Sequence, residues 1–363
     1  MTLARAFDLK SNSLNLLRVL LAACVIVSHS WPIGGFGRDP EIGGTALGEW
    51  GVIGFFIISG YLITSSRLRM AMGPFLLRRA ARILPGFWVC LVAVAFVAAP
   101  LAALASGDPY SLTSGASYVL RNADLWISRP HIASTLRGVP YAGPDGLGPW
   151  NGSLWTLSYE FACYVGAGVL LWWGVARRTP AVTAALWVLA TLADVATHHV
   201  HVPAPVANLS FLGSCFLAGA LLRMYAHRIP FSGRHATAAL VILAVVAAAD
   251  QVATVGALPF AYLLLWVSVR APFHRFGSRN DVSYGLYIYA FPVQELLARA
   301  GLQRAGVGAF VAASAVLTVA PAWLSWVCVE RPAKDWSARW IARRRAGLPL
   351  RATAEPAAAS APL

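Results

Sequence analysis

Charged residues are scarce in this chain. Of its 363 residues only 12% are Asp, Glu, Lys or Arg, whereas 58% are hydrophobic, and the mean hydropathy is +0.62. A soluble domain of this length does not need so large an apolar fraction. The composition therefore argues against a soluble globular protein and favours a helical protein that crosses a membrane many times.

Acidic residues are the scarcest charged group, with 15 Asp and Glu against 29 Lys and Arg, for a formal net charge of +14. Such an excess can indicate a nucleic-acid partner. Here, however, the arginines form short runs between apolar segments, which is how membrane topology is encoded. We therefore expect membrane lipid as a partner and no nucleic acid.

Metal-ligand and disulfide patterns are also lacking. The five cysteines lie inside apolar stretches without paired spacing, which argues against a disulfide framework and a zinc site. His198, His199 and His201 are close together, but no Cys or carboxylate beside them completes a ligand set. We predict no metal site.

Ten apolar segments of spanning or nearly spanning length can be marked, and they predict an all-α polytopic membrane protein with about ten transmembrane helices. An even number of spans places both termini on one side. With the termini cytoplasmic, nearly all basic residues lie inside, as the positive-inside rule requires; the exceptions are Arg38, Arg121, Arg129, Arg137, Arg299 and Arg304. The segments are 14–33, 48–66, 84–104, 150–174, 181–197, 205–223, 236–250, 256–270, 283–299 and 306–329.

This pattern divides the chain into three parts. Residues 1–12 form a cytoplasmic segment, and 13–340 form the transmembrane domain. Within that domain 105–149 is the one long connection, rich in Gly, Pro, Ser and aromatic residues, and we expect a structured extracytoplasmic loop. Residues 341–363 are basic and then rich in Ala and Pro, which predicts a disordered cytoplasmic tail.

The first apolar segment carries two ionisable residues, Arg18 and His29, with ten residues between them. Eleven helical steps turn through about 1100°, roughly 20° past three full turns, so both side chains project from one face. Ionisable groups in a membrane helix are costly and usually face a protein interior or a wet cavity. The spacing therefore predicts a functional face on this helix.

Four further stretches carry polar chemistry within or beside apolar segments. "GFFIISGYLIT" and "LLRRAARILPGF" are followed by "GSLWTLSYEFACY", which buries Glu160, and by "SYGLYIYAFPV". Arg79 and Arg82 are three residues apart and share a helix face, an arrangement suited to gripping phosphate. The other candidate residues are Ser59, Gly60, Tyr61, Trp155, Tyr284 and Tyr287.

Together these stretches resemble the membrane-bound acyltransferase-3 family, whose members O-acylate bacterial surface and secreted glycans. Arg18 and His29 match the family's R-x10-H pattern, and "RRAARILP" and "LWTLSYEFACY" match two further motifs. "SYGLYIYAFPV" looks like its S-Y-x-x-Y segment, although Ala290 stands where many members place a His. The resemblance covers roughly residues 10–340 and ends on "ERPAKDW".

The resemblance implies a multi-pass enzyme of the bacterial inner membrane. It would transfer an acyl group, most simply acetyl, from a cytoplasmic acyl-CoA to a hydroxyl of a glycan or glycolipid acceptor such as lipopolysaccharide or exopolysaccharide. It would be an acyltransferase for groups other than amino-acyl groups. Acyl-CoA would be its donor substrate, with no cofactor bound permanently.

The resemblance also suggests a role for each candidate residue. His29 would be a general base or a transient acyl carrier, with Arg18 and Glu160 beside it as catalytic residues. Arg79 and Arg82 would hold the phosphates of CoA, and Ser59, Gly60 and Tyr61 would complete the donor site. Trp155, Tyr284 and Tyr287 would contact the acceptor.

Two other classes of protein also fit buried Arg, His and Glu. A polytopic transporter or flippase of a sugar-linked lipid or a small organic acid is the main alternative. Against it stand the absence of an internal repeat and the arginine pair at the cytoplasmic side. A catalytically silent partner subunit would leave the buried charges without a purpose.

Overall fold

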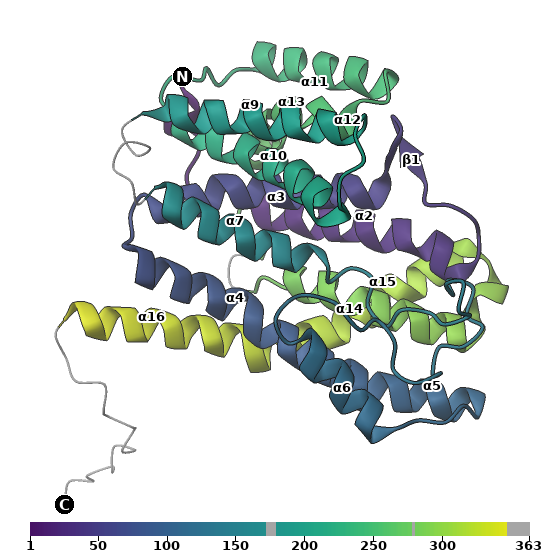
Figure 1. Cartoon of the computed structure of the whole chain (residues 1–363). Coiled ribbons are helices and arrows are strands. Elements are labelled where there is room, and N and C mark those ends of the chain that lie inside the picture. The colour runs from purple at the N-terminus through teal and green to yellow at the C-terminus, as the bar shows by residue number, and fades with distance from the viewer. Residues whose placement is uncertain (172–178, 278–279, 347–363) are drawn as a thin grey trace, which may run out of the picture.

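The computed structural model describes residues 1–171, 179–277 and 280–346, and the protein is mostly helical in this part of the chain (Figure 1). One two-stranded hairpin, β1 and β2, connects α2 to α3. The elements are α1 (Leu3–Ala6), α2 (Leu14–Gly34), β1 (Glu41–Ile42), β2 (Thr45–Ala46), α3 (Leu47–Arg67), α4 (Met72–Ala93), a π-helical turn (Val94–Ala98), α5 (Ala99–Ser106), α6 (Leu112–Asn122), α7 (Thr156–Leu170), α9 (Pro180–Thr197), α10 (Ala204–Met224), α11 (Gly233–Ala248), α12 (Val252–Val255), α13 (Ala257–Arg270), α14 (Ser283–Arg299), a 3₁₀ turn (Leu302–Ala305), α15 (Val307–Ser325), a second π-helical turn (Trp326–Glu330) and α16 (Arg331–Arg345).

Within the described residues, six helical segments are long and apolar enough to cross a membrane. They are Leu14–Gly34, Leu47–Arg67, Met72–Ser106, Pro180–Thr197, Ala204–Met224 and Val307–Arg344. The other four predicted segments correspond to shorter helices, α7, α11, α13 and α14, of 14 to 17 residues. The structure thus supports a polytopic membrane protein, while the count of ten spans stays a prediction.

Many of these helices present apolar side chains outward. In the span of α9 only 11% of the residues are buried inside the protein, and Leu189 and Leu192 of this helix are exposed. Leucine faces of this size on a helix are disfavoured in water but favourable in hydrocarbon. The exposed surface therefore agrees with the sequence in indicating contact with lipid.

The tightest helix packing joins α3 to α10. A Cβ on Gly60 would lie 1.9 Å from the carbonyl oxygen of Phe216, and one on Gly219 would lie 2.0 Å from that of Ile57. Small residues let membrane helices approach closely, since packing rather than exclusion of water holds them together. Gly60 and Gly219 therefore serve the contact between the backbones of α3 and α10.

The helix α14 carries a proline in its interior. Pro292 has no N–H, so the carbonyl of Ile288 loses its helical partner. Asn151 replaces it by donating a hydrogen bond from Nδ2 to that carbonyl at 2.8 Å. Ser153 adds a hydrogen bond from Oγ to the carbonyl of Tyr287. The segment before α7 is therefore fastened to α14.

Two expectations about the connections can be compared with the structure. The long connection contains α6 and ends beside the fully buried Trp150, while its extracytoplasmic position stays a prediction. The predicted disordered tail, 341–363, starts too early, because α16 remains helical to Arg345. The rest of the tail, from 347 onward, lies outside the described residues, as does part of the predicted segment 150–174.

Candidate functional site

A network of ion pairs joins three distant parts of the chain at one end of the bundle. The Asp281 carboxylate, just before α14, accepts hydrogen bonds at 2.7 Å from Arg18 of α2 and from Arg82 of α4. Ser283 donates a third, also at 2.7 Å. Burial alone would raise the pKa of Asp281, but Arg18 and Arg82 hold that pKa well below its usual range. Asp281 is therefore a fixed anion between two cations.

A second carboxylate, Glu330, completes the network. Its side chain is fully buried and lies 3.5 Å from Nη1 of Arg82. Ser325 donates a hydrogen bond to the other Glu330 oxygen at 3.1 Å. A π-helical turn lies at this point (Trp326–Glu330), and such turns often mark functional sites. Arg82 is thus neutralised twice, by Asp281 and by Glu330.

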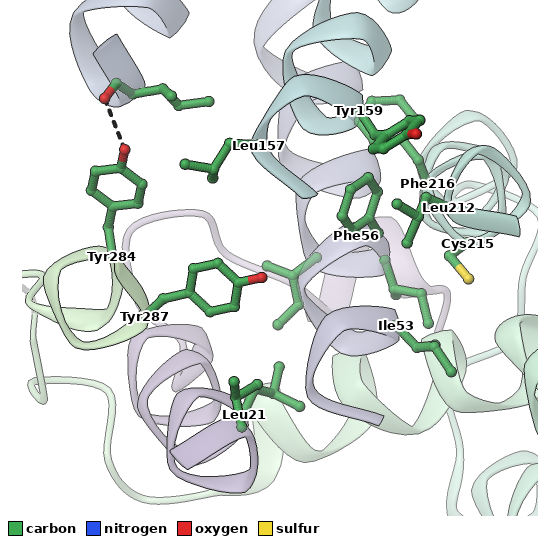
Figure 2. Packing of buried hydrophobic residues seen from close by; sticks show 14 of the residues in the cluster. Leu21, Ile53, Phe56, Leu157, Tyr159, Leu212, Cys215, Phe216, Tyr284 and Tyr287 are labelled. Carbon is green, nitrogen blue, oxygen red and sulfur yellow. Dashed lines mark hydrogen bonds between the residues drawn. The ribbon is translucent and has the colours of Figure 1, made fainter. Parts of the chain in front are cut away.

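A small cavity of about 100 Å³ lies beside this network. Arg82 contributes to its wall and stacks over the Tyr284 ring, 5.7 Å from the ring centroid. The Tyr284 hydroxyl is fixed by donating to the carbonyl of Ile83 at 2.8 Å (Figure 2). The polar side chains that line the cavity are Arg18, Ser59, Arg79, Arg82, Thr156, Glu160, Tyr164, Ser283, Tyr284 and Tyr287. The structure thus brings together most of the site residues predicted from the sequence.

Glu160 lies in the wall of this cavity with two hydroxyl groups. Tyr164, one turn later on α7, donates a short hydrogen bond to Oε1 of Glu160. Ser59 of α3 donates to the same oxygen at 3.4 Å. In the described part of the chain, Glu160 forms no ion pair with an arginine. Glu160 can therefore act inside the cavity, and it does not lie beside His29.

Arg79 differs from its neighbour Arg82 in having no counterion. Both side chains line the cavity, which confirms that they share a face. The Nε of Arg79 is buried without a hydrogen-bond partner, and the described residues include no carboxylate within ion-pair distance. Arg79 is half-buried, and a partly desolvated guanidinium without a counterion can pair with an anionic ligand. Arg79 is the cation in this cavity that is suited to bind such a ligand.

His29 lies outside the cavity, toward the other end of α2. Its ring makes an edge contact with Phe291 of α14, with 5.5 Å between centroids. Its Nδ1 lies 4.0 Å from Oδ1 of Asp39, which also accepts a hydrogen bond from Ser28 at 2.5 Å. Arg18 contacts Asp281, two residues before α14, and His29 contacts Phe291 within α14. Both side chains therefore project toward the same neighbour, which confirms that they share a helix face. They are separated by about 16 Å of helix.

The positions of residues along α14 show how far the cavity lies from His29. Tyr284 and Tyr287 line the cavity, and Phe291 contacts His29 one turn after Tyr287, a rise of about 6 Å. Tyr287 is held by the carbonyl of Ser153 at 2.9 Å and by the hydroxyl of Thr156 at 2.7 Å. The cavity therefore ends one helical turn short of His29.

Besides His29, three predicted site residues lie away from this cavity. Gly60 faces α10, and Tyr61 is 3% exposed and packs against Phe7 with 4.9 Å between ring centroids. These contacts place both residues in the packing of α3. Trp155 lines a separate pocket with Trp126. In Figure 2, Tyr159 of the same helix lies beside Phe216 of α10, on the side of α7 opposite Tyr284.

The sequence reasoning missed three carboxylates at these places, Asp281, Glu330 and Asp39. Each lies a few residues from a recognised motif: Asp281 two residues before "SYGLY", Glu330 at the start of "ERPAKDW", and Asp39 ten residues after His29. Acidic residues are rare on the predicted cytoplasmic side, so Asp281 and Glu330 stand out there as candidates for pairing with buried arginines.

Comparison with known proteins identifies relatives of this chain. A family model described as an acyltransferase domain matches residues 11–328. The chain is 29% identical to an O-acetyl transferase of Shigella phage Sf6 over 332 residues, which cover 89% of this chain and 96% of the relative. It is also 29% identical to Nodulation protein 10 of Rhizobium leguminosarum bv. viciae over 365 residues, covering 92% of this chain and 96% of that protein. No solved structure matches.

The family match covers nearly the whole chain, and it includes Arg18, His29, Arg79, Arg82 and Glu160. This match makes the protein an acyltransferase for groups other than amino-acyl groups. It argues against the alternative prediction of a transporter. The chain belongs to the membrane-bound acyltransferase-3 family and is an O-acyltransferase.

Proposed function

We propose that the protein transfers an acetyl group from cytoplasmic acetyl-CoA to a hydroxyl of a cell-envelope or exported glycan, on the outer side of the bacterial inner membrane. The observation that carries this proposal is the cavity that contains Arg79, a cation without a counterion, and that ends one helical turn of α14 short of His29. Its small volume, about 100 Å³, favours a short acyl group over a long chain.

In this proposal Arg79 binds a phosphate of CoA, because it is the cavity cation without a counterion. Arg82 and Arg18 are paired with Asp281, which keeps this wall of the cavity rigid and leaves Arg79 as its uncompensated cation. The thiol end of CoA then enters between Ser59, Glu160 and Tyr284. Acetyl-CoA is a substrate here, and both termini of the protein are cytoplasmic.

His29 takes the proton from the acceptor hydroxyl, and Asp39 beside it stabilises the imidazolium that forms. The hydroxyl oxygen bonds to the acetyl carbonyl carbon while the carbon–sulfur bond of the thioester breaks. The proton on His29 is returned to the CoA thiolate, so the products are the ester and free CoA. For this step the thioester end of acetyl-CoA, with both its carbonyl and its sulfur, must reach past Tyr287 and Phe291, which separate the cavity from His29.

The test uses the full-length protein purified in lipid nanodiscs with acetyl-CoA and a bacterial glycan. Release of free CoA thiol, with a gain of one acetyl mass on the glycan, is the expected result. His29→Ala should release CoA at less than about one hundredth of the normal rate, the loss expected when general-base help is removed. If wild-type protein leaves acetyl-CoA intact while it transfers an acyl group from another donor, the donor assignment is wrong.

A further inference from the structure

A second face of α7, on the side opposite the cavity that contains Arg79, also lines pockets. On this side a groove runs between α7, α9 and α10 and contains two adjoining pockets. The outer pocket, about 260 Å³, begins at the first turns of α7 and α10, with Ser158 and Asn208 in its wall. The inner pocket, about 570 Å³, continues from Ala162 and Leu209, one turn further into the bundle.

The outer pocket combines aromatic rings with polar groups. Trp126 and Trp155 are 47% and 39% exposed, and both rings meet Tyr159, with centroids 6.3 and 5.7 Å away. Asn208 donates its amide to the Tyr159 hydroxyl at 3.4 Å. The C–H face of a sugar ring stacks on such aromatic rings, and its hydroxyls bond to amide and hydroxyl groups of this kind. The outer pocket therefore has the chemistry of a sugar site.

Tryptophans at a membrane interface also occur as simple anchors. Trp126 and Trp155 differ from anchors because they come from separate parts of the chain and together wall a pocket that contains Ser158 and Asn208. An anchor needs neither the pocket nor its polar side chains. The arrangement fits a ligand better than it fits a belt of interfacial residues.

The inner pocket is almost entirely apolar. Small residues on α7 and α10, including Gly166 and Gly213, leave the space open, and leucines of α9 close it. A Cβ on either of these glycines would meet nothing within 4 Å. The buried Thr183 hydroxyl lines this pocket and has no hydrogen-bond partner. At the depth of a membrane, a pocket of this shape and polarity fits a hydrocarbon chain.

We infer that the α7–α9–α10 groove binds the acceptor as a glycolipid, with a sugar on Trp126 and Trp155 and its hydrocarbon chain in the inner pocket. The inference rests on the proposed function, because it names the class of acceptor for that reaction. A free glycan would use the outer pocket alone and would leave the larger, apolar pocket without a purpose.

The segment that leads into the outer pocket also packs near His29. Gly152, three residues before Trp155, packs so closely on Phe291 that a Cβ there would lie 2.5 Å from the ring. Phe291 in turn contacts the His29 ring. The sugar on Trp155 is then a neighbour of the sugar that receives the acetyl group, so the groove determines binding and specificity rather than the chemical step.

The test measures binding without acyl-CoA, so that it is independent of catalysis. The probe is a glucosyl lipid with a diazirine on its hydrocarbon chain, compared with the same lipid lacking glucose, on full-length protein in nanodiscs. We expect the glucosyl lipid to label α7 and α10 peptides several-fold more than the lipid without glucose. The double variant W126A/W155A should reduce its labelling to the level of the lipid without glucose.

Filling the inner pocket gives the second arm. Gly213→Leu and, as an independent variant, Gly166→Leu should weaken glucosyl-lipid labelling about tenfold, the change expected from displacing about two methylenes of the chain. Gly308→Leu on α15 is the matched control, because its Cβ also meets nothing within 4 Å and it lies outside the groove. Labelling of this control should equal that of the wild type.

Two results would overturn the inference. Equal labelling by both lipids would mean that the groove holds an ordinary lipid chain, and unchanged labelling in both glycine variants would place the chain elsewhere. Consumption of acetyl-CoA, measured separately on the same samples, tests the proposed function. Selective labelling without acetyl-CoA consumption would refute the donor reaction and support the glycolipid site. Consumption of acetyl-CoA without selective labelling would support the donor reaction and refute the glycolipid site.

Discussion

The network around Asp281 offers the sharpest test of how the cavity is held together. Asp281→Asn removes the carboxylate that binds Arg18 and Arg82 at 2.7 Å and leaves both cations nearby. Breaking a buried ion pair costs about 3–5 kcal/mol. Arg18 and Arg82 are 21% and 11% exposed, and Glu330 still faces Arg82. Solvent and Glu330 therefore reduce the expected loss to about 2–3 kcal/mol.

The assay is thermal unfolding of the purified protein in detergent, together with acetyl-CoA consumption. We expect the melting temperature of Asp281→Asn to fall by several degrees and its turnover to drop, because Arg18 and Arg82 lose their fixed positions. Asp335→Asn, at an exposed aspartate of α16, is the control and should change neither quantity. Combining Asp281→Asn with Arg18→Gln should cost less than the sum of the two, by about 1–2 kcal/mol. Full additivity, or an unchanged melting temperature for Asp281→Asn, would refute the network.

Three further predictions concern single positions. In cells, His29→Ala should abolish glycan acetylation although the variant protein reaches its normal level in the membrane, whereas His198→Ala should leave acetylation unchanged. Mass analysis of the glycan, normalised to protein level, measures both. Normal acetylation by His29→Ala would refute the proposed role of His29. Arg79→Ala should raise the KM for acetyl-CoA by about tenfold or more and Arg79→Lys should restore it only in part, because Lys lacks the planar fork; an unchanged KM in both would contradict phosphate binding. Gly219→Ala should lower the yield of folded protein, since its Cβ would meet a carbonyl oxygen at 2.0 Å, while Gly213→Ala should not; size-exclusion profiles of the two detergent extracts decide the matter.

The sequence was most informative where the signal is local. Apolar length predicted helices in each of the ten segments, and helical periodicity predicted that Arg18 and His29 face one neighbour. The spacing of Arg79 and Arg82 predicted that they share a helix face, and both line the same cavity. These predictions succeed because a membrane helix satisfies its backbone internally, so its residues fix its geometry without reference to the rest of the fold.

The parts that failed depend on which helices become neighbours. The pairing of Arg82 with Asp281 joins residues 199 positions apart, and no local pattern specifies it. Gly60 was assigned to the donor site because its motif suggested a ligand, but the approach of α10 determines its role. Trp155 and Glu160 lie on different faces of α7, and only the placement of α10 shows that one face forms a second groove.

The layer between the cavity and His29 has a consequence for the energy supply of the cell. Tyr287 and Phe291 are both almost completely buried, and Gly152 packs directly on Phe291. Protons and ions cross a membrane protein along chains of water, and packed aromatic rings interrupt such chains. In the proposed reaction the thioester end of acetyl-CoA passes when these rings change rotamer, with the gap filled by the substrate itself. The proposed transfer to a glycan outside the cell would therefore proceed without discharging the proton gradient across the membrane.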